Sequence, residues 1–271
     1  MQKMIIVPDL RSESLDLMSD CISILPKFIY MLEPWRTGRV VKIENVNTSI
    51  RRFWIEVSEL ERFDFKPGQF VTLDLPINEK KNKRWRSYSI ASTPDGSNVF
   101  ELIIVLLEDG AGTAYLFNEV QVGTELLLRG PQGIFTLPER LDNDLFLICT
   151  GTGIAPFRSM VNYIHDRNLL HKNIYLIYGC RKFSDTLYEE ELKALTKKLG
   201  NFHYLPVYSR EQPREGIATG YVHAVYDHIV RESKPEAYFF LCGWKNMIDE
   251  AKQRIMALGY DRKAIHLELY G

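Results

Sequence analysis

One stretch of the sequence, "RWRSYSIAST", carries residue types that suit a ligand with both a phosphate and a flat aromatic system. Arg86 and Tyr88 are two residues apart, so on a strand they lie on the same face. The arginine offers a fork of donors for a phosphate, and the tyrosine offers a ring for stacking. The alternative for this stretch is an ordinary half-exposed strand.

A second stretch, "CTGTGIAPF", has the composition of a strand-to-helix turn that binds a pyrophosphate. Gly151 and Gly153 let the backbone approach a ligand, and Pro156 suits the first turn of a helix. The N–H groups that begin such a helix point out of the carboxyl edge of a sheet, where pyrophosphates bind. The glycines do not match GxGxxG, so a purely structural turn is the alternative.

The elements that must hold the first stretch are short strands. The segment "RRFWIEV" alternates, with Phe53, Ile55 and Val57 on one face. "QFVTLDL", "VFELIIVLL" and "TELLLRG" follow, and turn signals rich in proline and glycine separate them. This spacing predicts a closed antiparallel, Greek-key β-barrel domain over residues 35–142.

The elements that must hold the second stretch alternate between strands and helices. Five buried strands are expected in "DLFLIC", "NIYLIYG", "HYLPVYS", "AYFFLCG" and "AIHLELY". Helices are expected over about 154–167, 185–198 and 221–232, and a fourth is expected to end near Gly259. The pattern predicts an α/β domain with a doubly wound parallel sheet over residues 143–271.

Composition and charge exclude several classes of protein. The net charge of -1 argues against a general nucleic-acid binder. The four cysteines have neither CxxC spacing nor the spacing of a plant-type [2Fe-2S] cluster, so no metal site is predicted. Pro26 and Lys27 interrupt the N-terminal apolar stretch, which predicts neither a signal peptide nor a membrane span. We expect a cytoplasmic protein with an N-terminal extension, residues 1–34, of unassigned role.

Together the two stretches resemble the ferredoxin–NADP reductase family, which has RxYS in a flavin-binding barrel and GTGIAPF at the start of a nicotinamide nucleotide domain. The resemblance covers about residues 35–271. It implies FAD and NADP(H) as cofactors, with hydride passing between them. It also implies that single electrons pass between FAD and a separate carrier such as ferredoxin or flavodoxin.

The resemblance implies roles for the barrel residues. Arg86 is expected to hold the FAD pyrophosphate, Tyr88 to stack on the isoalloxazine ring, and Ser89 to lie near flavin N5. "DGAGTAYL" resembles the family's second FAD phosphate loop, and a simple turn is the alternative there. Further FAD contacts are expected at Ser87, Ile104, Val105, Ala111, Gly112 and Thr113.

The resemblance also implies roles in the second domain. The turn expected to cradle the NADP pyrophosphate consists of Gly151, Thr152, Gly153, Ile154, Ala155 and Pro156. "LCGWKNMI" resembles the family's CGxxxM segment, which places Cys242 beside nicotinamide C4 and flavin N5, with Gly243 and Met247 in the same site. Inert packing is the alternative for Cys242.

The stretch "YSREQ" bears on the choice of nucleotide. A ribose 2′-phosphate needs a cation and donors, whereas a site for NAD favours a carboxylate. Ser209 and Arg210 match the Ser-Arg pair of plant-type members, and Arg181 is expected to assist them. The family's following tyrosine and glutamine are replaced by the glycines and alanine of "GIATG". We expect NADP(H), with a solvated loop charge as the alternative for Arg210.

A run of basic residues precedes the flavin strand in "EKKNKRWR". It is expected to dock an acidic ferredoxin or flavodoxin, with a solvated loop as the alternative. The residues concerned are Lys80, Lys81, Lys83 and Arg84.

The C-terminus "HLELYG" matches the Glu-x-Tyr ending of plant-type reductases. The match implies that Glu268 joins Ser89 and Cys242 in a polar set around flavin N5. It implies that Tyr270 covers the flavin face, with a strand-end aromatic as the alternative.

Two other functions stay open at this point. One is the reductase component of an oxygenase, using NADH or NADPH. The other is an electron-transfer subunit held in a larger complex. Members of that kind often add a cysteine-rich C-terminal extension, and the end at Gly271 argues against it.

Overall fold

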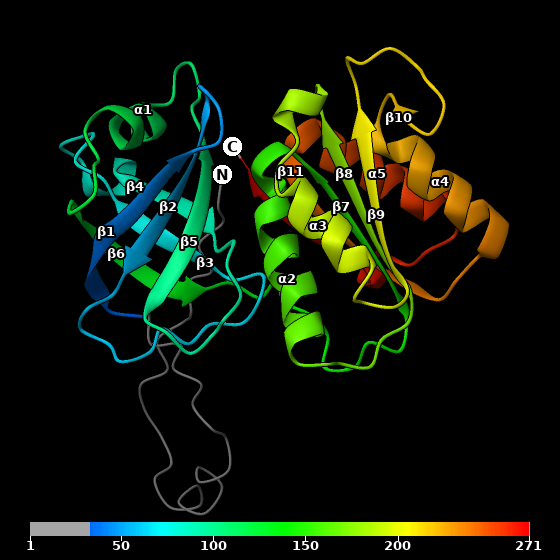
Figure 1. The fold of residues 1–271 in the computed structure, drawn as a ribbon, viewed down its shortest axis with the longest axis horizontal. Helices are drawn as coiled ribbons and strands as arrows, with labels where there is room; N and C mark the ends of the chain where they lie inside the picture. The colour runs from blue at the N-terminus through cyan, green and yellow to red at the C-terminus, as the bar shows by residue number, and fades with distance from the viewer. Residues whose placement is uncertain (1–32, 271) are drawn as a thin grey trace, which may run out of the picture. The chain divides into compact units, whose positions relative to one another are not determined.

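A computed structural model describes residues 33–270 of the chain (Figure 1). The expected N-terminal extension, 1–34, lies almost wholly outside the described residues, as does Gly271. None of the helices in the described part is both long and apolar enough to cross a membrane.

The first half is an antiparallel six-stranded sheet in the order β4-β3-β6-β1-β2-β5. Placing β6 between β3 and β1 makes the connections Greek-key. An antiparallel bridge between Ile90 and Leu102, just beyond β4, joins the two edge strands and closes the sheet into the predicted barrel. The strands are β1 (Trp35–Asn45), β2 (Ile50–Glu56), β3 (Phe70–Asp74), β4 (Trp85–Ser89), β5 (Val99–Val105) and β6 (Glu125–Gln132).

Alternation along the strands fills the barrel as the sequence predicts. Phe53 and Ile55 of β2 are buried in the interior with Val71 and Leu73 of β3. One short helix, α1 (Ala111–Asn118), lies between β5 and β6 in the chain and buries Leu116 against the same cluster. A single 3₁₀ turn, Lys81–Lys83, precedes β4.

The second half is a parallel six-stranded sheet in the order β10-β9-β8-β7-β11-β12. Its strands are β7 (Asp144–Thr150), β8 (Ile174–Cys180), β9 (Phe202–Tyr208), β10 (Ala218–Thr219), β11 (Ala237–Trp244) and β12 (Ile265–Tyr270). Five of them are the five predicted strands. The sixth, β10, has only two residues, and the sequence analysis missed it because so short a segment carries no periodicity.

Two apolar clusters cover the two faces of this sheet, as a doubly wound fold requires. One contains α2 (Ile154–Asp166) and α3 (Glu189–Thr196), and the other contains α4 (Val222–Ser233) and α5 (Lys245–Ala257) (Figure 1). Gly259 follows α5 with φ +97°, in the capping conformation predicted for it.

The helix expected over 185–198 is shorter than predicted. A 3₁₀ turn, Phe183–Asp185, comes first, and Tyr188 then adopts φ +55°, which is incompatible with a continuous right-handed helix. The α-helix therefore begins only at Glu189.

The chain order reverses between β7 and its neighbour β11. From β7 the chain proceeds to β8 on one side, and it returns to β11 on the other. In open parallel sheets this switch point leaves a crevice at the carboxyl ends of the strands, where ligands bind. The turn after β7 and the end of β11 are therefore the elements that position the candidate site.

Candidate active site

Two glycines, Gly153 and Gly243, allow the backbone to pack closely at the carboxyl ends of β7 and β11. A Cβ on Gly153 would lie 2.5 Å from the carbonyl oxygen of Cys242, and one on Gly243 would lie 2.5 Å from Oγ1 of Thr150. Gly151 differs, because it has φ +55° and open space within 4 Å of where a Cβ would be. The loop is thus pressed against β11 on one side and open on the other.

The open side of this loop has the properties of an anion site. Gly153 gives no side-chain cap to α2. The N–H of Ile154 donates to the carbonyl of Gly151 and Pro156 has no N–H, so the other N–H groups of this first turn are the ones left for a ligand. Oγ1 of Thr150, by contrast, lies on the β11 side of the loop next to Gly243, and it is buried without a hydrogen-bond partner among the described residues. A pyrophosphate fits the open side at Gly151, because its oxygens accept hydrogen bonds from backbone N–H groups and no side chain blocks the approach.

The remaining nucleotide-loop residues support this turn. Thr152 lies in the 3₁₀ turn Gly151–Gly153, and Ile154, Ala155 and Pro156 form the buried first turn of α2. Met247 lies in the first turn of α5, where its Cε would be 3.2 Å from a Cβ on Gly243. These side chains shape the loop.

A second anion site lies at the start of α1. A Cβ on Gly112 would lie 2.9 Å from Cγ and 3.1 Å from Nε of Arg86, so the arginine stem crosses the first helical turn. Gly110 caps α1 without a side chain. The guanidinium is anchored by donating from one nitrogen to the carbonyls of Lys83 (3.0 Å) and Trp85 (2.8 Å). A helix N-terminus beside an arginine fits a pyrophosphate.

The other predicted FAD residues divide by the way their side chains are used. Thr113 donates to the carbonyl of Gly110 (2.9 Å) and accepts from the N–H of Leu107 (3.1 Å), so its hydroxyl holds the loop. Ile104 packs in the barrel interior, which leaves only its backbone for a ligand. Val105 is half-buried and Ala111 is exposed.

The flavin-strand residues Ser87 and Tyr88 point in opposite senses. Tyr88 packs beside the barrel interior, and burial raises its pKa to about 12, against the opposing effect of Arg86. The ring therefore remains a neutral phenol at physiological pH. Oγ of Ser87 lies 3.0 Å from Oγ1 of Thr72, so this hydroxyl pairs within the barrel sheet.

The four predicted catalytic residues come together from both halves of the molecule. Ser89, at the end of β4, donates its hydroxyl to Oε1 of Glu268 on β12. Cys242 is the register partner of Glu268 across β11 and β12. Tyr270, two residues further along, packs beside the cluster that contains Cys242.

Burial controls protonation in this group. It raises the pKa of the Cys242 thiol, and the Glu268 carboxylate raises it further, so the sulfur is a neutral thiol at physiological pH. Burial also raises the pKa of Glu268, against the opposing effect of the Ser89 hydrogen bond. Burial raises the pKa of Tyr270 too. The set therefore holds protons more tightly than the same groups in water.

The residues expected to select the nucleotide lie at the far end of the same sheet edge. Arg181, Ser209 and Arg210 are all exposed. Their backbones are tied together, because the N–H of Arg210 donates to the carbonyl of Arg181 (2.9 Å). The carboxylate of Glu211 accepts from the N–H of Phe183 (3.0 Å). Neither arginine forms an ion pair with any described residue.

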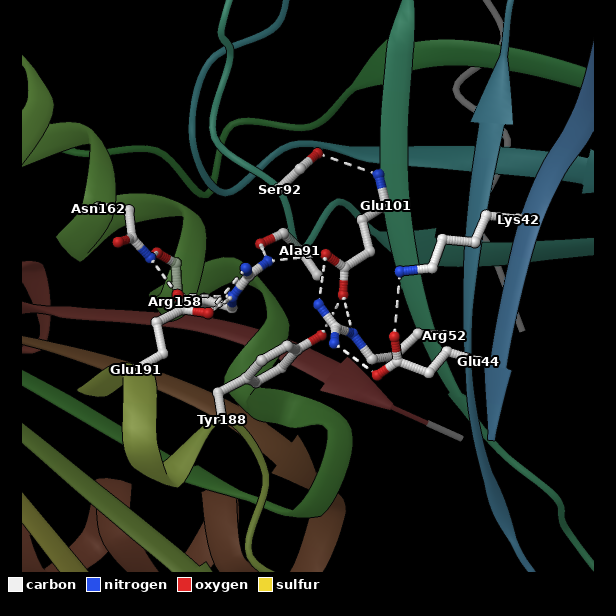
Figure 2. A network of polar contacts seen from close by, with 10 residues as sticks. All are labelled: Lys42, Glu44, Arg52, Ala91, Ser92, Glu101, Arg158, Asn162, Tyr188 and Glu191. Carbon is white, nitrogen blue, oxygen red and sulfur yellow. Dashed lines mark hydrogen bonds and ion pairs between the residues drawn. The ribbon is translucent and has the colours of Figure 1, made fainter. Parts of the chain in front are cut away.

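Sequence reasoning missed two parts of the site. One is an aromatic group beside Arg210: Arg214 lies 4.7 Å from the ring centroid of Phe183, which packs edge-on against Tyr208. The other is a polar network that joins Glu101 of β5 to Arg158 of α2 (Figure 2). Arg158 lies two residues after the glycine loop in "GTGIAPFR", and this proximity was the available signal.

The basic run before β4 is not uniform. Lys80, Lys81 and Lys83 are exposed. Arg84 is half-buried, with Nε 2.6 Å from Oδ1 of Asp74. Its charge is therefore partly neutralised.

Comparison with known families matches both halves of the chain. A model of the oxidoreductase FAD-binding domain matches residues 37–137, and a model of the oxidoreductase NAD-binding domain matches residues 147–253. The barrel and the parallel sheet correspond to these two matches.

Known proteins resemble most of the chain. Ferredoxin--NADP reductase B of Sorangium cellulosum is 32% identical over 244 residues, which cover 88% of this chain and 98% of that protein. The electron transfer component of anthranilate 1,2-dioxygenase from Acinetobacter baylyi is 30% identical, but the chain spans only 60% of its length. A crystal structure of a ferredoxin NADP⁺ reductase from Neisseria gonorrhoeae with bound FAD and NADP has a TM-score of 0.72 and 26% identity, with 87% of this chain and 98% of that one covered.

Proposed function

The chain belongs to the ferredoxin–NADP reductase family, and from this premise we propose that it exchanges electrons between NADP(H) and a separate small redox protein by means of FAD. It is an FAD-dependent oxidoreductase with an FAD-binding and an NAD-binding domain. The observation that carries the proposal is the contact of Ser89 with Glu268 beside Cys242. It brings the barrel and the nucleotide sheet together at one small polar site.

FAD would be held mainly by the anion site at the start of α1, beside Arg86. Arg86 and the N-terminus of α1 would bind its pyrophosphate, and Tyr88 would offer its neutral ring for stacking. When bound, FAD supplies the chemistry that converts a two-electron hydride into single electrons. The residues themselves contribute binding, orientation and exclusion of water.

Ser89, Cys242 and Glu268 would form the reacting edge. Ser89 and Cys242 are buried, so little water reaches them. Because its pKa is raised, Glu268 binds a proton more readily than an exposed carboxyl does, and the Ser89 hydroxyl that donates to Oε1 is the group through which it would exchange that proton. Tyr270 would cover the site until nicotinamide displaces it.

The exposed arginines favour NADP(H) over NAD(H). Arg181 and Arg210 offer two cationic forks, and Ser209 offers a hydroxyl, while the nearby carboxylate of Glu211 is engaged by Phe183. Tyr221, which directly follows "GIATG" and is 74% exposed, offers a ring for the adenine.

The partner is a separate redox protein, and we propose that it is an acidic ferredoxin or flavodoxin. The exposed Lys80, Lys81 and Lys83 precede the strand that carries Arg86, so they would steer such a partner toward the flavin. Reversing all three charges should lower the catalytic efficiency with ferredoxin and weaken its salt dependence. Reduction of a small uncharged acceptor should not change.

We propose a cytoplasmic location, because the described cysteines are free thiols.

A second candidate is the reductase component of an oxygenase. The match to the anthranilate dioxygenase component favours it, although the chain covers 60% of that protein. NADH and an oxygenase partner would then replace NADPH and ferredoxin.

The first experiment asks whether the protein uses FAD and which acceptor it prefers. Purified protein should be yellow or should acquire FAD, and it should reduce cytochrome c with NADPH only when ferredoxin or flavodoxin is added. A colourless protein unable to bind FAD would refute the proposal. Preference for NADH would select the second candidate.

A further inference from the structure

A buried carboxylate of the barrel lies at the centre of a polar network that spans both domains (Figure 2). Glu101 of β5 is only 2% exposed. It accepts two hydrogen bonds from Arg52 of the barrel (2.7 and 3.1 Å), one from the hydroxyl of Tyr188 (2.6 Å) and one from Arg158 of α2 (2.9 Å). A buried carboxylate that accepts four hydrogen bonds is fully satisfied, so the network holds the Glu101 side chain in one position.

Arg158 uses its whole guanidinium in this network. One terminal nitrogen donates to Glu101 and to the carbonyl of Ala91 (2.9 Å). Nε and the other terminal nitrogen donate to the carboxylate of Glu191 at 2.8–3.0 Å. The fork therefore holds a barrel strand, a barrel loop and α3 at once. Only the planar fork of arginine can make all of these bonds.

Tyr188 completes the contact at the cost of an unusual backbone. Its φ of +55° is rare for a bulky residue and ends the preceding turn. In this conformation its ring centroid lies 4.3 Å from the guanidinium of Arg158 and 4.9 Å from that of Arg52. Strained residues of this kind cluster where a specific geometry is needed.

Both arginines remain charged despite their burial. Burial acts to lower the pKa of Arg158, but Glu101 and Glu191 outweigh it and raise that pKa. Arg52 behaves in the same way toward Glu101, and on its outer side it donates to Glu44 (2.8 Å). The network is a balanced set of buried charges, in which breaking one bond leaves another charge unpaired.

The network holds together the two barrel segments whose pairing closes the sheet. We call this pairing, between residues 90–92 and residues 101–102, the seam; it begins one residue after Ser89. The N–H of Ala91 donates to the carbonyl of Glu101 (2.8 Å), and the N–H of Glu101 donates to Oγ of Ser92 (3.0 Å). Ala91 follows Ser89 by two residues. At the other end, Arg158 follows Ile154, the first residue of α2, by about one helical turn. One side chain thus connects the segment that follows Ser89 in the barrel to the helix that begins at the glycine loop.

We propose that Arg158 is a positioning residue: through Ala91 and Glu101 it fixes Ser89 of the barrel relative to the nucleotide loop and Cys242 of the sheet. The inference rests on the proposed function, because a fixed separation matters only if hydride passes between ligands held by the two domains. A displacement of about 1 Å between reacting groups costs roughly 100-fold in rate. A network that only stabilised the fold would leave this rate unchanged.

The test compares Arg158→Lys with wild type and with a matched control, Arg231→Lys. Lysine keeps the charge but loses the fork, whereas Arg231, within residues 33–270, pairs only with Asp227 on its own helix. In FAD-loaded Arg158→Lys, hydride transfer from NADPH should slow by about 100-fold, while the Kd for NADP⁺ stays unchanged. When Arg158→Lys is mixed with NADPH, the charge-transfer absorbance between nicotinamide and flavin should be lost. The control, Arg231→Lys, should behave as wild type.

A second measurement does not depend on FAD or on turnover. Hydrogen exchange of the Ala91 amide, measured in the protein without FAD, should accelerate by about tenfold in Arg158→Lys, because the seam opens locally. The amide of Ile148, in the sheet core, should exchange as in wild type.

The outcomes separate this inference from the proposed function. If wild-type protein is not reduced by NADPH, the proposed function is wrong, and the exchange data alone then judge whether Arg158 holds the seam. If wild type is reduced and Arg158→Lys matches it in rate and in Ala91 exchange, the positioning role is overturned. A loss of NADP⁺ affinity in proportion to the rate would also overturn it.

Should Arg158→Lys fail to fold, Tyr188→Phe provides the same test with a smaller change. It removes one donor to Glu101 and keeps the ring between the domains. We expect a fall in hydride-transfer rate of about tenfold with unchanged NADP⁺ affinity. A rate equal to wild type would contradict the inference.

Discussion

The two ends of the candidate nucleotide site are built in different ways. The reacting end combines Ser89 and Glu268, which are 179 positions apart in the chain, with the buried Cys242. The selecting end, Arg181 and Arg210, is exposed and is joined by a short backbone contact between neighbouring loops. The first end depends on the packing of two domains, and the second depends on local loops. Rate and nucleotide preference should therefore respond to different mutations.

The largest effect is expected at the reacting end. Cys242→Ser should slow hydride transfer by on the order of 100-fold, because a smaller, more polar side chain in this buried position disturbs the alignment of the reacting groups. Affinity for NADP⁺ should remain near that of wild type. Stopped-flow and equilibrium titration measure the two quantities. The buried Cys149→Ser, in the same register on β7, is the matched control. If both variants lose only affinity, Cys242 does not act at the reacting end.

At the selecting end the expected pattern is the reverse. Arg210→Ala should raise the KM for NADPH by roughly 10-fold, because a charge-assisted hydrogen bond contributes about 1.5 kcal/mol or more. The KM for NADH and the hydride-transfer rate at saturation should not change. Arg140→Ala, an exposed loop arginine that pairs with Asp142, serves as the control. Equal changes for the two nucleotides would remove Arg210 from a 2′-phosphate role.

A smaller effect is expected from the C-terminus, where Tyr270 lies at the reacting end. Removing Tyr270 and Gly271 should strengthen nicotinamide binding by about 2- to 10-fold, since aromatic stacking contributes roughly 0.5–1.5 kcal/mol. It should also relax discrimination between NADPH and NADH. Removing Gly271 alone is the control. Unchanged nucleotide affinities in the longer truncation would leave Tyr270 as a strand-end aromatic.

The smallest effect concerns stability and pH. Burial raises the pKa of Glu268 above its ordinary value of 4.5. The folded protein therefore binds this proton more tightly than the unfolded chain, and the associated stability is lost as pH rises from that value through the folded pKa. Glu268→Gln lacks this term, so its Tm relative to wild type should increase between pH 5 and pH 7.5. A Tm difference that falls over this range would show that Glu268 is not destabilised by burial.

The sequence predicts the local parts of this molecule and not the contacts between them. The glycine loop, residues 151–156, is predictable because a turn of this kind is formed by consecutive backbone groups. The five main parallel strands were predicted from hydrophobic runs. The placement of Glu101 against Arg158 was not, because no periodicity pairs residues on separate domains. Nor could the sequence indicate that Arg84 pairs with Asp74, which weakens its predicted part in docking.

The shortened helix α3 makes the same point. Its residues favour a helix over a longer stretch, but Tyr188 leaves the helical conformation to reach Glu101 of the barrel. A tertiary contact thus overrides the local preference. The roles of the site residues themselves stay predictions until they are tested.

The most direct test of the account is anaerobic stopped-flow reduction of the FAD-loaded protein by NADPH and by NADH, followed by mixing with oxidised ferredoxin or flavodoxin. We expect NADPH to bleach the flavin absorbance faster than NADH at equal concentration, and the added carrier to restore the absorbance. Failure of both nucleotides to bleach the flavin would contradict the central claim.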